Sequence, residues 1–318
     1  MTNVDYLRVS VTDRCNLRCI YCNPLDADGL LDRTEILSAD EIERVVRLCV
    51  QLGVTRVRLT GGEPLVQEDI VDLVGRLAAI DGIRDLALTT NGVLLSAMAG
   101  ALKSAGLQRV NISLDAAEGG CFRRITGSDA LAQAMSGVHE ALAVGLAPVR
   151  LNCVVLRQIN TAEIPALAEL SCRLPVSVRF IEYCPPSQTA GHADWYVSSD
   201  EVHDLIKSRF GTLVPVVPTN AGGPAVYFRI DGASGTVGFI SGRSAMFCRH
   251  CRRLRLTSDG KLRPCLHAAK GYDIKGLLRN GAADVALSDV IERALREKHR
   301  FTKLGATAPD FSMQHVGG

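Results

Sequence analysis

The chain has 318 residues, 47% of them hydrophobic, and a formal net charge of +2. It is long enough to bury a large core and suits a βα barrel with an appended region. The small net charge gives no argument for nucleic acid or membrane binding, and no apolar run is long enough to cross a bilayer. No signal peptide is visible at the N-terminus, and the clustered cysteines fit a reducing cytoplasm.

Short β-rich runs alternate with helical patterns through the first 185 residues. The predicted strands are Tyr6–Thr12, Thr55–Thr60, Asp85–Thr90, Arg109–Leu114, Pro148–Leu156 and Val176–Tyr183. The predicted helices are Ala39–Leu52, Ile70–Ala79, Leu131–Val144 and Ile164–Leu174. This alternation predicts parallel strands joined by right-handed crossovers. The fold class is therefore α/β, an incomplete (β/α)6 TIM-like barrel with its chemistry at the C-terminal ends of the strands.

The composition shifts from Val197, and we expect the barrel (1–190) to give way to a smaller β-containing region (191–318) that carries the second cysteine motif. This region is expected to close the open side of the barrel. Its predicted elements are a helix at Asp200–Phe210, strands at Leu213–Val217, Val226–Ile230 and Thr236–Ile240, and a last helix at Leu287–Lys298.

Three cysteines follow the first strand in a C-x3-C-x2-C pattern: Cys15, Cys19 and Cys22. A loop this tight can bring three thiolates to one face of a small cluster, and thiolates select soft metals and iron–sulfur clusters. A cubane has four irons, so three ligands leave one iron open to bind another molecule. Zinc and buried inert cysteines are the alternatives, although structural zinc takes four ligands in a closed site.

This spacing, with Tyr21 before the last cysteine, resembles the signature of the radical S-adenosylmethionine (SAM) enzymes. In that superfamily SAM chelates the open iron, and an electron from the cluster cleaves it to a 5′-deoxyadenosyl radical. The longer stretch Asp5–Pro24 resembles more specifically the GTP 3′,8-cyclase family, which begins molybdenum cofactor biosynthesis. The resemblance implies a [4Fe–4S] cluster on Cys15, Cys19 and Cys22, with SAM as cofactor and no protein side chain as the catalytic group.

Gly61-Gly62-Glu63-Pro64 follows the second strand, where glycines allow close backbone approach. Alone, this segment also fits an ordinary βα turn. Beside the cysteine motif it resembles the superfamily segment whose backbone recognises the amino group of SAM. The full set of SAM contacts that the resemblance implies is Tyr21, Gly61, Gly62, Glu63, Ser113, Asn152 and Cys184.

Five arginines interrupt otherwise apolar strands: Arg8, Arg56, Arg58, Arg150 and Arg179. Side chains alternate along a strand, so Arg56, Arg58 and Thr60 share one face. An unpaired arginine inside a barrel costs several kcal/mol, and the strands hold few carboxylates, Glu182 being the obvious one. A polyanionic ligand is expected because guanidinium groups match phosphate oxygens. The alternatives are side chains that reach water at strand ends or pair with carboxylates on the helix side.

Cys248, Cys251 and Cys265 form a second motif, C-x2-C-x13-C. It again offers three thiolates without an obvious fourth. A zinc site using His250 or His267 is the alternative. In the cyclase family this motif carries a second [4Fe–4S] cluster, whose open iron binds the purine of GTP.

The resemblance implies that GTP is the substrate and 3′,8-cyclo-7,8-dihydro-GTP the product. The implied substrate contacts are Arg8, Arg56, Arg58, Thr89, Arg150, Arg179, Arg253, Leu254 and Arg255. The Gly317-Gly318 end resembles the cyclase tail that reaches into the active-site channel, although such an end is ordinarily frayed. The expected partners are an electron donor and a downstream cyclic pyranopterin monophosphate synthase. A second copy of the chain, forming a homodimer, is a further candidate partner.

Three positions depart from the family pattern. The family usually has methionine at Cys184, proline at Gly242 and asparagine at Arg252. A diverged radical SAM paralogue acting on another nucleotide or on a peptide therefore remains an alternative. A non-catalytic protein that binds a metal or a nucleotide is a second alternative, and it predicts no cleavage of SAM.

Overall fold

The structure is a computed structural model that describes residues 4–22, 30–185, 192–217, 223–245, 251–266, 268 and 271–298. Several residues that the sequence analysis singled out lie outside these ranges: Cys248, His250, His267, Gly317 and Gly318. Within the described ranges, no helix has the length and apolarity that crossing a bilayer requires.

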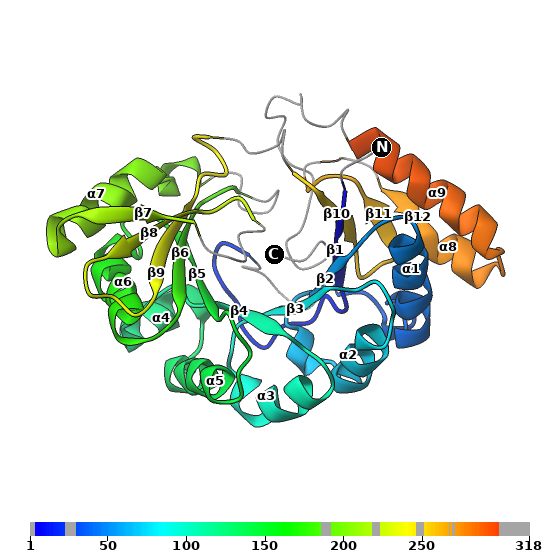
Figure 1. Cartoon of the computed structure of the whole chain (residues 1–318), viewed down its shortest axis with the longest axis horizontal. Helices are drawn as coiled ribbons and strands as arrows, with labels where there is room; N and C mark the ends of the chain where they lie inside the picture. Colours follow the sequence, from blue (N-terminus) through cyan, green and yellow to red (C-terminus); the bar gives the residue numbers. More distant parts are fainter. Residues whose placement is uncertain are drawn as a thin grey trace.

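Six parallel strands form the centre of one curved sheet (Figure 1). They are β1 (Tyr6–Ser10), β2 (Arg56–Thr60), β3 (Asp85–Thr90), β4 (Arg109–Ser113), β5 (Arg150–Val155) and β6 (Ser177–Glu182). Each strand pairs in parallel with the next one along the chain. The prediction of an incomplete six-strand barrel is confirmed, and all six strands were predicted to within two residues at either end.

Helices cover the outer face of this sheet (Figure 1). They are α1 (Ala39–Gln51), α2 (Ile70–Ala78), α3 (Leu95–Ser104), α4 (Gly119–Thr126), α5 (Leu131–Ala143) and α6 (Ile164–Arg173). Ser38 caps α1 through a capping box with Glu41, which satisfies two backbone N–H groups at the helix start. The sequence analysis did not predict α3, where alanines and a glycine weaken the apolar periodicity, or α4, which has only eight residues and begins with two glycines.

The C-terminal strands extend the same sheet at both edges, and this is how the region flanks the open side of the barrel. Next to β6 lie β9 (Thr236–Ile240), β8 (Val226–Ile230) and β7 (Leu213–Val216); next to β1 lie β10 (Arg253–Leu256), β11 (Lys261–Arg263) and β12 (Tyr272–Asp273). The remaining helices are α7 (Ser199–Phe210), α8 (Ile274–Arg279) and α9 (Asp284–Glu297). Short 3-10 turns are η2 (Arg33–Glu35), η3 (Pro64–Val66), η4 (Thr161–Glu163) and η6 (Ala193–Trp195). A boundary near residue 190 stays a prediction.

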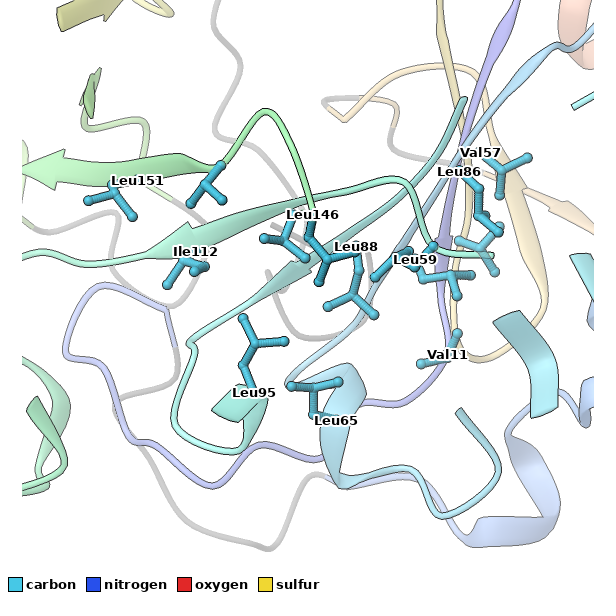
Figure 2. Close-up of a cluster of buried hydrophobic side chains, with 14 of the residues drawn as sticks. Val11, Val57, Leu59, Leu65, Leu86, Leu88, Leu95, Ile112, Leu146 and Leu151 are labelled. Carbon is cyan, nitrogen blue, oxygen red and sulfur yellow. The ribbon is translucent and has the colours of Figure 1, made fainter. Parts of the chain in front are cut away.

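The two faces of the central strands differ in chemistry. The outward side chains are apolar and fully buried against the helices, as Val57, Leu59, Leu88 and Ile112 illustrate in Figure 2. Burying each such side chain stabilises the fold by about 1.5–3 kcal/mol. Because side chains alternate along a strand, this apolar outer layer directs every intervening side chain into the barrel.

Candidate functional site

A cavity of about 830 Å³ occupies the inside of the barrel. This volume falls within the range of ligand-binding pockets. The residues that line it include Arg8, Arg56, Arg58, Thr60, Thr89, Ser113, Arg150, Asn152, Arg179, Arg253 and Arg255. The five strand arginines therefore point inward, as the period-two pattern predicted.

Cysteines line both ends of this cavity. Cys15, Cys19 and Cys22 lie beyond the C-terminal end of β1, whereas Cys251 precedes β10. The register pairs Tyr6 with Arg253, so Cys251 lies at the N-terminal end of the barrel strands. At about 3.3 Å per residue, β1 alone separates the two ends by about 17 Å.

The N-terminal cysteine loop is fixed to the barrel through its backbone. Arg18 N donates to Thr126 O (2.9 Å) and Ile20 N to Ile125 O (3.0 Å), at the end of α4. Leu17 N donates to the sulfur of Cys15 at 3.4 Å, a contact typical of iron–sulfur ligands. No three His, Cys, Asp or Glu side chains in the described part of the chain are spaced to hold a single metal ion.

Three free thiols on one loop that lines the cavity fit an iron–sulfur cluster by donor type. Burial, with the neighbouring Cys15 and Asp115, raises the pKa of Cys22 to about 12. Burial also raises the pKa of Cys19 well above its ordinary value. These thiols therefore keep their protons at neutral pH in the metal-free chain, and a metal would have to displace those protons in order to bind.

Asp115 anchors Tyr21, and sequence reasoning had not assigned it a role. Tyr21 Oη donates to Asp115 Oδ2 at 2.5 Å, and Val154 N donates to Asp115 Oδ1 at 2.8 Å. Asn160 Nδ2 donates to the backbone oxygen of Asp115 at 2.9 Å. Burial raises the pKa of Asp115 to about 6. The tyrosine of the cysteine motif is thereby tied to β4 and β5.

The two glycines of the Gly61-Gly62-Glu63 segment are needed for close packing against the cysteine loop. Gly62 N donates to Thr12 O at 2.8 Å, and Glu63 N donates to Arg14 O at 2.7 Å. A Cβ on Gly62 would lie 2.3 Å from Arg14 O. The segment thus supports the backbone that leads into Cys15.

Glu63 is fully enclosed and organises the loop after β3. Its carboxylate accepts hydrogen bonds from Thr90 Oγ1 (2.7 Å), Leu65 N (3.0 Å) and Asn91 N (2.6 Å). Burial nevertheless raises its pKa to about 7. Asn91 Nδ2 continues this network to Asn16 Oδ1 at 2.7 Å, within the cysteine loop.

Asn152 and Arg179 lie beside each other in the sheet register, next to Ser113. Arg179 donates from Nε (2.9 Å) and Nη2 (2.5 Å) to Asn152 Oδ1. Tyr227 on β8 also hydrogen-bonds Arg179 and lines the cavity. Tyr227 packs over Gly238, where a Cβ would lie 3.0 Å from its ring. No local pattern pointed to Tyr227 as a partner of Arg179, because β8 and β6 are distant in the sequence.

Two carboxylates pair three arginines at the N-terminal end of the cavity. Asp5 accepts from Arg56 Nη2 at 2.6 Å and from Arg252 Nη2 at 3.1 Å. Asp85 pairs with Arg109, an inward-facing arginine that the sequence analysis did not name. Glu182, the partner expected from the sequence, instead binds the backbone N–H groups of 199, 243 and 244.

The other arginines crowd one another. Burial and neighbouring cations, Arg255 foremost, hold the pKa of Arg8 well below its usual range. Burial lowers the pKa of Arg58 to about 10, and burial with Arg179 does the same for Arg150. In the described chain, Arg58 Nε, Arg109 Nη1 and Asn111 Oδ1 are buried without a hydrogen-bond partner. Each arginine stays charged at neutral pH, so the cavity suits a polyanion.

Tyr6 lies at the start of β1 among these arginines. The guanidinium carbons of Arg56 and Arg58 lie 5.2 and 5.7 Å from its ring centre. Leu254 differs from its neighbours: it belongs to the hydrophobic core on the opposite face, while Arg253 and Arg255 line the cavity. Thr89 lines the cavity and accepts from Arg58 Nη1 at 3.4 Å.

The C-terminal cysteine site has the opposite electrostatics to the N-terminal one. Burial alone would raise the pKa of the Cys251 thiol. The positive charges of Arg253 and Lys298 outweigh burial and hold this pKa at about 6. Burial with Arg253 lowers the pKa of Arg255 to about 10. Cys265 has a free thiol, and Cys248 lies outside the described residues. Two thiols beside cations again fit a soft, anionic cluster.

Two of the departures from the family pattern lie next to each other. A Cβ on Gly242 would be 3.1 Å from the sulfur of Cys184, and both residues line the cavity. The third departure, Arg252, is paired with Asp5 at the other end.

Comparison with known proteins defines the class. Residues 9–171 match the model of the radical SAM superfamily, and residues 176–304 match Molybdenum Cofactor Synthesis C. In structure, the chain resembles Streptococcus suis SuiB bound to its precursor peptide SuiA, with a TM-score of 0.64 and 17% identity, covering 92% of this chain and 67% of that one. The chain is therefore a radical SAM enzyme with the partial barrel of that superfamily.

Relatives named GTP 3′,8-cyclase narrow the class. The proteins from Thermodesulfovibrio yellowstonii and Pelotomaculum thermopropionicum are each 46% identical over 317 residues, which cover 99% of this chain and 98% of each relative. The chain belongs to the GTP 3′,8-cyclase family of molybdenum cofactor biosynthesis. Members of this family are radical SAM lyases that use SAM and iron–sulfur chemistry.

Proposed function

We propose that this chain converts GTP to 3′,8-cyclo-7,8-dihydro-GTP, the first step of molybdenum cofactor biosynthesis. The observation that carries the proposal is one cavity with thiols at both ends and a group of buried arginines between them. A purine nucleoside triphosphate matches this arrangement, because its polyanionic triphosphate can bind the arginines while its base can ligate a metal at one end.

We propose two [4Fe–4S] clusters, one on Cys15, Cys19 and Cys22 and one on Cys248, Cys251 and Cys265. When bound, the first cluster and SAM supply the radical that removes the C3′ hydrogen of GTP. Tyr21, Gly61, Gly62, Glu63, Ser113, Asn152 and Cys184 would form the SAM side of the cavity. Of these, Glu63 would act indirectly, because its carboxylate is engaged by Thr90, Leu65 and Asn91.

The arginines would hold the triphosphate and exclude water, which strengthens each charge–charge interaction. Arg8, Arg58, Arg150, Arg253 and Arg255 are the proposed phosphate ligands. Arg56 and Arg179 are proposed as secondary contacts, since Asp5 and Asn152 already engage them. Thr89 is proposed to bind the nucleotide, and Leu254 to contact it only through its backbone.

We propose a cytoplasmic enzyme that takes electrons from a separate donor and passes its product to a cyclic pyranopterin monophosphate synthase. The Gly317-Gly318 tail is proposed to enter the cavity, which predicts that truncation before Gly317 lowers turnover while both clusters are kept. We also propose a homodimer, which sedimentation would detect as twice the mass of one chain.

A second candidate is a radical SAM paralogue that acts on another nucleotide or on a peptide. Gly242 and Cys184 together leave more room than the family's proline and methionine would, which favours testing other purine nucleotides. The likeness to the peptide-bound SuiB concerns the fold alone. Nothing about a peptide would require so many arginines inside the barrel.

The deciding experiment is anaerobic reconstitution with iron and sulfide, followed by reaction with dithionite, SAM and GTP. Consumption of GTP with formation of 5′-deoxyadenosine and the cyclised product supports the proposal. Consumption of ATP or of a peptide in its place contradicts it, and zinc without SAM cleavage indicates a binding protein.

Matched variants test the second cluster. Replacing Cys248, Cys251 and Cys265 by serine is expected to remove about half of the bound iron. Cys49→Ser is the control, because Cys49 is a fully buried cysteine outside both motifs. Unchanged iron content in the triple variant would overturn the two-cluster count.

A further inference from the structure

Lys298, directly after α9, is buried beside the C-terminal cysteine site. Only 4% of this residue is exposed. Its Nζ donates to Pro264 O at 2.6 Å and to the sulfur of Cys251 at 3.4 Å. The same ammonium therefore contacts both segments that carry described cysteines of the motif, one at Cys251 and one at the residue before Cys265.

Burial of this ammonium needs an explanation. Lysine is almost never fully buried unless it is paired, because removing its charge from water costs several kcal/mol. The ion pairs of the described residues reach Lys275 and Lys261 but do not include Lys298. Its partners in the structure are a carbonyl oxygen and a thiol sulfur, and of these only the sulfur can become an anion.

The end of α9 is also held in place independently of the cysteines. Tyr272 on β12 donates a hydrogen bond to the carboxylate of Glu297, the residue before Lys298. Leu295 and Ala294 in the same turn are buried in the core. The helix end is thus anchored, and the lysine is presented to the cysteine site by a rigid element.

We infer that Lys298 is a positioning residue for the C-terminal cysteine site, where its ammonium donates to the Cys251 sulfur and offsets the negative charge of a thiolate-bound cluster. This inference rests on the second cluster proposed above. The residue would act through Cys251 and would not itself contact the substrate.

Two effects follow from a charged donor at a ligand sulfur. Hydrogen bonds and positive charge near the sulfurs stabilise the reduced, more negative state, so they raise the reduction potential of a cluster. Partners that orient a metal ligand also support metal retention, and losing one typically costs 10–100-fold in affinity. Both effects concern the C-terminal site alone, since the other three cysteines lie at the far end of the cavity.

The test compares Lys298→Met, Lys298→Gln and Lys298→Arg in the full-length reconstituted protein. The control is Arg296→Met on the same helix, where an exposed arginine pairs with Glu292 at 2.8 Å. Iron release to a chelator and the potentials of the two clusters, resolved by electron paramagnetic resonance, are the readouts. Urea unfolding of each variant reports stability separately.

We expect Lys298→Met to release the iron of the C-terminal site roughly tenfold faster than wild type and to lower the potential of that cluster only. Lys298→Gln keeps a donor without the charge and should fall between Met and wild type. Lys298→Arg should keep the potential near that of wild type, and Arg296→Met should change neither readout.

Three results would overturn the inference. A purely structural role predicts lower stability in Lys298→Met with an unchanged potential. Equal effects of Lys298→Met and Arg296→Met would indicate a general charge effect. Wild-type protein with iron for one cluster only would remove the second cluster from the proposed function, and the inference with it, before any variant is compared.

Discussion

Both ends of the cavity carry cysteines, but in opposite electrostatic surroundings. The N-terminal thiols lie near Asp115 and Glu63, and burial raises the pKa of Cys22 to about 12. The C-terminal Cys251 lies beside Arg253 and Lys298, and its pKa is held at about 6. We propose that SAM, a sulfonium cation, binds at the end with the carboxylates and that GTP, a polyanion, binds toward the end with the cations, because each ligand then meets complementary charge.

The largest expected effect comes from an arginine in the middle of the cavity. Arg58→Met should weaken GTP binding about 30-fold or more, because truncating one partner of a buried charge pair costs about 2–5 kcal/mol. Arg56→Met should cost less, since Asp5 already pairs with Arg56. Calorimetric titration of GTP measures both. Equal losses of GTP affinity in the two variants would contradict the distinction between an arginine paired with a carboxylate and one surrounded by other arginines.

The next effect concerns the support of the N-terminal cysteine loop. Gly62→Ala places a methyl group 2.3 Å from the backbone oxygen of Arg14. We expect destabilisation of about 1–3 kcal/mol and loss of N-terminal iron. Iron analysis should find the C-terminal cluster retained. Gly119→Ala is the control, because a Cβ there meets nothing within 4 Å.

A pH effect should distinguish the carboxylate end. Burial raises the pKa of Glu63 from 4.5 to about 7, so the folded chain holds this proton more tightly than the unfolded chain. The contribution of this group to the free energy of unfolding is therefore fully present below about pH 4.5 and is lost as the pH rises through about 7, a change of about 3 kcal/mol.

Urea unfolding of the iron-free chain across this range measures the slope. Glu63→Gln should flatten the curve, although the variant will be less stable overall, because an amide nitrogen cannot accept from Asn91 N. Stability that rises between pH 5 and 7 in wild type but not in the variant would contradict the assignment.

The smallest expected effect lies where two departures from the family meet. Gly242→Ala brings a methyl group 3.1 Å from the Cys184 sulfur, a contact that the neighbour can relieve by a small shift. We expect SAM affinity to change no more than about fivefold, a cost of about 1 kcal/mol. A double-mutant cycle with Cys184→Ala checks the coupling. Additive effects would mean that the two sites are independent.

Local sequence patterns were enough to predict the first cysteine site, the six central strands and the inward-facing arginines. The C-x3-C-x2-C spacing of the first motif required no tertiary information, because a short loop brings its own thiols together. The six central strands and the inward arginines followed from a period of two along each strand. The C-terminal strands β10 to β12 were missed because they are short.

Contacts between residues far apart in the sequence could be identified only from the tertiary structure. Asp5 joins Arg56 to Arg252 because β10 pairs with β1, although these strands are far apart in the sequence. Lys298 contacts Cys251 across 47 residues of sequence. Local patterns describe which face a side chain occupies, and they carry no information on which remote residue shares that face. Partners of the arginines, the role of Tyr227 and the charge at each cysteine site therefore depended on how the sheet closes.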